Sequence, residues 1–83
     1  MIALPHDLEA EQAVLGALLF RNQMLDRLGS LSARHFYDPV HGRIFTAIIE
    51  GVRAGALVDG LTIKRRMASD PGLKELGFTD YLT

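Results

Sequence analysis

The chain has 83 residues, enough for one small domain that buries roughly 60% of its unfolded surface. It contains no cysteine, so disulfides and thiolate zinc sites are excluded. The formal net charge is −1, whereas a domain that mainly grips phosphates is normally basic, so nucleic-acid binding through bulk charge is disfavoured. No apolar run approaches the roughly 18 residues that span a bilayer, and the start lacks the basic region of a secretory signal. A cytosolic protein is therefore expected.

Residues 4–20, LPHDLEAEQAVLGALLF, predict the helix around which the rest of the chain is organised. Asp7 stands where an N-cap belongs, and Glu9 and Glu11 place negative charge in the first turn. Apolar residues then recur at helical spacing along one stripe: Leu8, Val14, Leu15, Leu18 and Leu19. Because such a helix is not stable alone in water, the rest of the chain must cover that stripe.

Two short helical segments and a second long helix are predicted next. Asn22 is expected to cap a short helix that ends at Gly29 in the left-handed conformation, and residues 31–37 to form a further turn. Asp38-Pro39 is the clearest helix start in the chain, because Asp suits the N-cap and Pro the first helical position. The apolar face of this helix is formed by Val40, Ile44, Phe45, Ile48, Ile49 and Val52. It should be the central buried helix.

Residues 56–61, ALVDGL, predict an extended connector that Leu57 and Leu61 pin to the core. Thr62 is then expected to cap a helix that runs to about Ala68. Its outward face would carry the basic run Lys64, Arg65 and Arg66. Such a run can touch phosphates or an acidic partner, although it is more often the solvated face of a helix. No strand-like alternation appears, so the domain is predicted to be all-α.

The sequence contains no constellation that argues for an enzyme. None of the eight glycines lies in a phosphate-binding loop, so nucleotide hydrolysis by this chain is not expected. His6, His35 and His41 have spacings that do not suit a metal site, and surface or supporting roles are favoured for them. Glu9 and Glu11 point to different sides of a helix and form no carboxylate pair, so their place in the first turn is a sufficient explanation.

Three segments resemble the amino-terminal domain of bacterial replicative DNA helicases, the DnaB family. LPHDLEAEQAVLGALL is similar to the opening of that domain. FYDPVHGRIFTAI is similar to a second pattern, carried here by Phe36, Tyr37, His41, Ile44 and Phe45. GALVDGLTI and GLKELGFTDYL resemble a Gly…Val-Asp…Thr turn and the entry into a further helix. The matches follow the family's order over residues 5–82.

The resemblance implies a small orthogonal helical bundle in which residues 1–83 form a single collar and primase-interaction domain. In the family a C-terminal helical hairpin follows this bundle, and this chain is expected to lack it. Members form hexameric rings that unwind DNA, using ATP and Mg²⁺ in a carboxy-terminal domain, so no catalytic residue, cofactor or metal is expected here. Paired hairpins form a collar that docks primase, and a helicase loader is a second candidate partner. This chain is expected to be a piece of a longer helicase and to be largely monomeric by itself. It is expected to contact DNA only as part of that longer protein and to contact no membrane.

Tyr81 and Leu82 fall in the family's motif at the base of that hairpin, where the resemblance implies a partner surface. Tyrosine suits such a surface, although a ring that closes the lower edge of the core explains Tyr81 equally well. Two other functions remain open. One is the helicase-binding domain of primase, against which the wording LEAEQAVLG argues. The other is a small helical DNA-binding domain that uses Lys64-Arg65-Arg66, against which the near-neutral charge argues.

Overall fold

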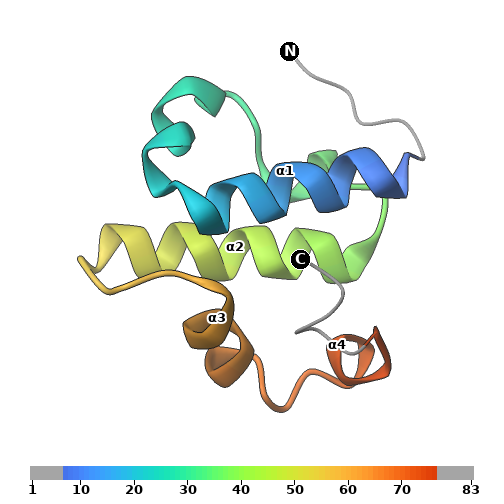
Figure 1. Cartoon of the computed structure of the whole chain (residues 1–83). Coiled ribbons are helices and arrows are strands. Elements are labelled where there is room, and N and C mark those ends of the chain that lie inside the picture. The colour runs from blue at the N-terminus through green and yellow to red at the C-terminus, as the bar shows by residue number, and fades with distance from the viewer. Residues whose placement is uncertain (1–6, 77–83) are drawn as a thin grey trace.

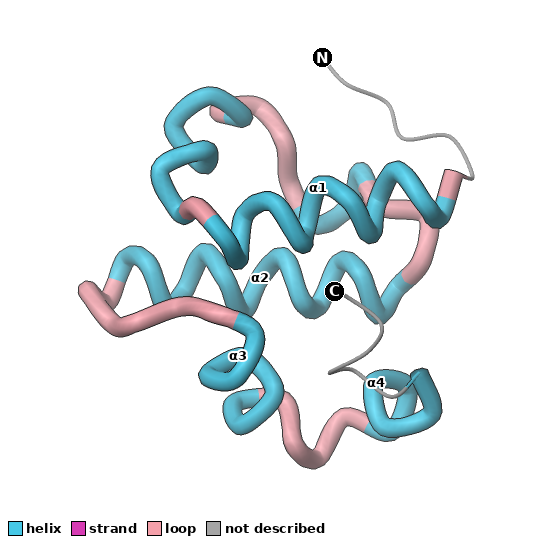
Figure 2. Tube along the Cα trace, viewed as in Figure 1, coloured by secondary structure: helices cyan, strands magenta, loops and turns pink. Residues whose placement is uncertain are grey.

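The computed structural model describes residues 7–76, and the side chains of residues 7–73. This part of the chain contains helices and no strand, which confirms the predicted all-α class. The elements in chain order are α1 (Leu8–Phe20), the short 3₁₀ helices η1 (Asn22–Leu28) and η2 (Ala33–His35), α2 (Pro39–Arg53), α3 (Gly60–Arg66) and α4 (Pro71–Leu76). α1 packs beside α2, while α3 and α4 lie on the other side of α2 (Figures 1 and 2). Within residues 7–76 no helix is long and apolar enough to cross a membrane.

The two long helices begin where the sequence predicts, because a carboxylate caps each of them. The Asp7 carboxylate accepts a hydrogen bond from a backbone N–H in the first turn of α1 at 2.9 Å. The Asp38 carboxylate accepts one from the N–H of Val40 at 2.8 Å, and Pro39 occupies the first helical position of α2. After α2, Gly55 has a φ of 72°, which glycine adopts at no steric cost. The predicted starts of both helices and the glycine stop of α2 are confirmed.

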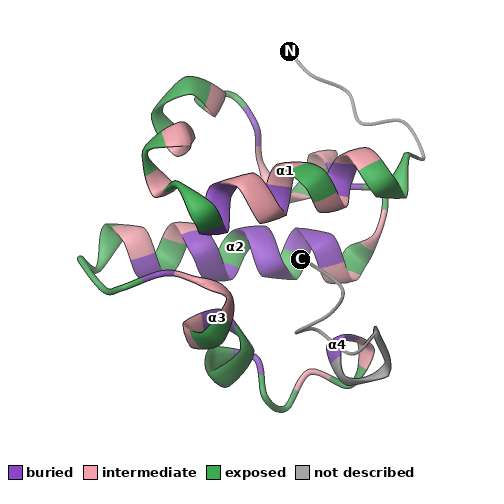
Figure 3. Ribbon diagram, in the orientation of Figure 1, coloured by how far each residue is buried: buried purple, intermediate pink, exposed green. Residues whose placement is uncertain are grey.

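The core lies between α1 and α2 and continues toward α3 (Figure 3). Its central aromatic contact joins Phe36 and Phe45, whose ring centroids are 5.2 Å apart. The buried apolar side chains of the described part are Leu15, Leu18, Leu19, Leu31, Phe36, Ile44, Phe45, Ala47, Ile48, Val58, Ile63, Met67 and Leu73. α2 contacts α1, η2 and α3, so it is the central buried helix, as predicted.

The connector between α2 and α3 is held differently from the prediction. Leu57 is 74% exposed and Leu61 is 55% exposed, so neither pins the connector to the core. Val58, which lies between them, is buried instead. It approaches α2 so closely that a Cβ on Gly51 would lie 2.6 Å from the Val58 Cγ2 atom. The absence of a side chain at Gly51 therefore lets the connector reach the core.

Two details of the predicted helix termini are wrong, namely the conformation of Gly29 and the start of α3. Gly29 has φ −43° and ψ −33°, which is right-handed and not the left-handed stop that the sequence suggested. α3 begins three residues earlier than predicted, because its N-cap is Asp59, which accepts a hydrogen bond from the N–H of Thr62 at 2.9 Å. The Thr62 hydroxyl accepts a hydrogen bond from the N–H of Asp59 in return, which completes a capping box. The helix ends at Arg66, and Pro71 then opens α4, which the sequence did not predict as a helix.

Candidate interaction site

A carboxylate from α1 holds the beginning of α2. Glu11 is fully buried, and its Oε2 atom accepts a hydrogen bond from the N–H of Tyr37 at 2.6 Å. Its Oε1 atom accepts another from the N–H of Asp38 at 3.3 Å and lies 2.8 Å from Nδ1 of His41, which is also fully buried. A buried carboxylate is tolerated only with such partners. Glu11 therefore joins α1 to the two residues that lead into α2 and to the first turn of α2.

This arrangement corrects the sequence interpretation of two residues. Glu11 does stand in the first turn of α1, but that position is not a sufficient explanation, because its side chain is buried against α2. The surface position considered for His41 is wrong, and its partner is Glu11. A signal was present in the spacing. Glu11 precedes the buried Leu15 by four residues, and His41 precedes the buried Phe45 by four, so each polar residue continues an apolar stripe.

The other histidines give no metal site within the described residues. The Nδ1 atom of His35 accepts a hydrogen bond from the N–H of Ser32 at 3.0 Å, so that ring completes a local turn. His6 lies outside the described residues. No group of three or more His, Cys, Asp or Glu side chains in the described part could hold a metal ion.

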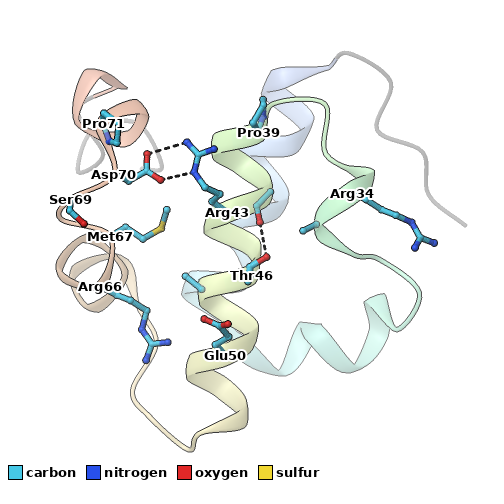
Figure 4. A pocket seen from close by; sticks show the side chains of 13 residues that line it. Arg34, Pro39, Arg43, Thr46, Glu50, Arg66, Met67, Ser69, Asp70 and Pro71 are labelled. Atoms are coloured by element: carbon cyan, nitrogen blue, oxygen red, sulfur yellow. Dashed lines mark hydrogen bonds and ion pairs between the residues drawn. The ribbon is translucent and has the colours of Figure 1, made fainter.

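A groove with a volume of about 820 Å³ runs between α2 and the segment that joins α3 to α4 (Figure 4). Small and apolar residues of α2 and Met67 from the end of α3 line its middle. Arg43 and Asp70 close one end, while Arg66 and Glu50 lie toward the other (Figure 4). Arg34 borders the groove, but its side chain points away from it in the same view. The groove thus combines an apolar lining with charged residues at both ends.

The Arg43–Asp70 pair connects α2 to the start of α4. Arg43 Nε donates to Asp70 Oδ2 at 2.6 Å, and Arg43 Nη2 donates to Asp70 Oδ1 at 3.1 Å, a two-pronged geometry. Asp70 Oδ1 also accepts a hydrogen bond from the N–H of Leu73 at 3.2 Å. The hydrogen bonds from Arg43 lower the pKa of the Asp70 carboxyl, and the same bonds raise the pKa of Arg43. These groups fix the shape of the groove.

The structure describes some of the candidate interface residues that the sequence predicts, but not all of them. Tyr81 and Leu82, the predicted partner-interface residues, lie outside the described residues. Lys64, Arg65 and Arg66 are all exposed on α3, which confirms the predicted outward face. Arg66 also lines the groove, and a Cβ on Gly51 of α2 would be 3.9 Å from its guanidinium carbon. One residue of the basic run therefore reaches the groove.

Comparison with known proteins gives one consistent result. Residues 3–83 match the family described as DnaB-like helicase N terminal domain. The chain is 31% identical over 80 residues to the replicative DNA helicase DnaB of Rickettsia felis. The aligned stretch covers 95% of this chain and 16% of that protein. It is 39% identical over 79 residues to the replicative DNA helicase DnaB of Treponema pallidum. Here the aligned stretch covers 94% of this chain and 18% of that protein. No solved structure gives a significant match.

The chain thus spans less than a fifth of the length of these two relatives, while the family match spans nearly all of the chain. The helicase resemblance of the sequence motifs is confirmed at the level of the family. This chain belongs to the family of DnaB-like helicase N-terminal domains.

Proposed function

We propose that this chain is the protein-interaction and ring-assembly domain at the N-terminus of a replicative ATP-dependent DNA helicase, and that it docks primase during primosome assembly. Family membership over residues 3–83 carries the proposal, because the relatives that match along the same stretch are replicative DNA helicases. The open groove between α2 and the α3–α4 segment supports a docking role rather than a catalytic one. The family match also favours the helicase over the helicase-binding domain of primase.

In this proposal residues 1–83 are one domain of a longer helicase chain. ATP and Mg²⁺ belong to the carboxy-terminal part of that longer protein, and this domain has no catalytic task of its own. The longer protein assembles into a hexameric ring, acts on DNA in the cytoplasm and meets no membrane. Primase is the proposed partner of this domain, and a helicase loader is the second candidate.

The proposed contact residues are Tyr81 and Leu82, which stand in the last segment that resembles the family. A tyrosine supplies a rigid ring with a polar tip, which is why it is common at the energetic centre of protein interfaces. The matched control is Tyr37, whose ring is exposed just before α2. Replacing each tyrosine by alanine compares the same truncation at two places in the chain.

The test is a calorimetric titration of the carboxy-terminal domain of the matching primase into this 83-residue chain. We expect measurable binding that Tyr81→Ala weakens by roughly tenfold, since truncation of a central interface residue costs more than about 1 kcal/mol. Tyr37→Ala should bind as the unchanged chain does. Absence of binding by a chain that is helical by circular dichroism would assign primase docking to another part of the helicase and overturn the proposal.

A further inference from the structure

Three large apolar side chains are exposed at the end of α1, in the connector and in the first turn of α3. Phe20 is 87% exposed, and Leu57 and Leu61 are also mostly exposed. The side-chain amide of Asn22 donates hydrogen bonds to the carbonyl of Leu18 at 2.7 Å and to the carbonyl of Val58 at 3.2 Å. The end of α1 is therefore tied to the connector that carries Leu57. Single exposed apolar residues are ordinary, but these three lie in segments that are tied together or consecutive in the chain.

Cations stand beside these apolar side chains. Arg21 follows Phe20, while Lys64 and Arg65 share a face of α3 with Leu61, because residues three and four apart on a helix lie on one side. Within residues 7–73, none of the three cations makes an ion pair. The nearest acidic residue in sequence to Leu61 is Asp59, whose carboxylate accepts the N–H of Thr62. The surface formed by Phe20, Arg21, Leu57, Leu61, Lys64 and Arg65 is named here the apolar–basic face.

We infer that the apolar–basic face is a docking site for an acidic amphipathic segment of a protein partner. The apolar side of such a segment would cover Phe20, Leu57 and Leu61, and its carboxylates would meet the three cations. Charge complementarity selects this occupant, since the face is basic although the chain as a whole is slightly acidic. A nucleic acid is the poorer fit, because Leu57 and Leu61 offer nothing to a phosphate backbone. The inference is independent of primase docking, because it rests on this face alone.

The test uses fluorescence anisotropy with the 83-residue chain and a labelled helical peptide of about 14 residues. The peptide carries leucines three and four positions apart on one side and glutamates on the other. One control peptide has lysine in place of glutamate, and a second has the same composition with the leucine spacing scrambled. Binding is expected for the acidic amphipathic peptide and not for either control.

Paired variants of the chain separate the two parts of the face. The first double variant combines Phe20→Ser with Leu57→Ser, and the second combines Lys64→Glu with Arg65→Glu. Each should raise the Kd for the acidic peptide by roughly tenfold or more. Leu8→Ser and Arg27→Glu change exposed residues of the same types elsewhere and should leave the Kd within about twofold. Because all of these side chains are exposed, circular dichroism should show the same helix content for every variant.

Three results would overturn the inference. The first is equal binding of the acidic and lysine peptides, and the second is binding that neither pair of variants weakens. The third is tighter binding of a single-stranded oligonucleotide or of phosphatidylglycerol vesicles than of the acidic peptide. If that binding requires Lys64 and Arg65 but not Phe20 and Leu57, the face is a phosphate-binding surface. A failed primase titration would leave this inference standing, since the peptides contain no primase sequence.

Discussion

At the scale of single residues, the buried Glu11 connects α1 to the segment that begins α2. It provides acceptors for two backbone N–H groups ahead of α2 and for the ring of a buried histidine. These donors belong to residues 37–41, which lie 26 to 30 positions further along the chain. Glu11 thus helps to set the position of α2 against α1.

Glu11→Ala should lower the free energy of unfolding by about 3 kcal/mol, because it leaves buried donors without an acceptor and opens a cavity beside His41. The measurement is urea unfolding followed by circular dichroism. Glu9→Ala is the matched control, since Glu9 stands in the same turn but is exposed, and its change should stay within about 0.5 kcal/mol. Similar stabilities for the two variants would show that the Glu11 contacts contribute little.

How far the sequence predicts such residues depends on whether the decisive contact is local. Asp7 and Asp38 are correctly predicted as caps because a cap acts on backbone groups two or three residues away. The burial of Glu11 depends on a segment some thirty residues away, so propensity and charge arguments miss it. Leu57 and Val58 show the same limit, because tertiary contact decides which neighbour in an extended connector turns inward.

At the scale of elements, the long helices and the short η1 and η2 are found where the sequence predicts them, whereas α3 and α4 are predicted less well. α1 and α2 have several turns whose apolar spacing is unambiguous, whereas α3 and α4 have only seven and six residues. A helix that short is not stable alone, so its bounds depend on caps and on packing. For α4 the decisive group is Asp70, which accepts hydrogen bonds from Arg43 on α2 and from the N–H of Leu73 in α4 itself.

The Arg43–Asp70 connection should make stability depend on pH in the acid range. Because the folded state lowers the pKa of Asp70, the unfolded chain binds more protons there, and the stabilisation present at neutral pH is lost as the pH falls below about 4. Asp70→Asn keeps a hydrogen-bonding cap but cannot ionise. The stability difference between the unchanged chain and this variant, measured by urea unfolding from pH 7 to pH 3, should shrink toward zero.

Asp26→Asn is the control for that titration, because Asp26 is exposed and makes no ion pair within the described side chains. It should change stability little at any pH. The effect of Asp70→Asn should be small, since Arg43 is half exposed and surface ion pairs contribute at most about 1 kcal/mol. A difference that stays constant down to pH 3 would show that the ion pair is not the source.

At the scale of the whole molecule, the near-neutral charge conceals an uneven distribution. Residues 7–38 contain five acidic residues and three arginines, while residues 39–73 contain three acidic residues and five cations. The exclusion of nucleic-acid binding from net charge is therefore an argument about the average, and it says nothing of α3 alone. Most of the basic residues beside the groove and on the apolar–basic face belong to residues 39–73, with Arg21 and Arg34 as the exceptions, and their charge favours acidic partners.

The same distribution bears on self-association, for which we expect a largely monomeric chain. Only three of the five large exposed apolar side chains in the described part share a face, which is less than a stable interface of about 1,200 Å² or more requires. Size-exclusion chromatography with light scattering should give the mass of one chain, 9.2 kDa, at moderate salt. Attraction between unlike halves would appear only at low salt, because ions screen exposed charges beyond about 10 Å at 0.1 M. A dimer or hexamer that persists at high salt would contradict the prediction and place a ring contact within these 83 residues.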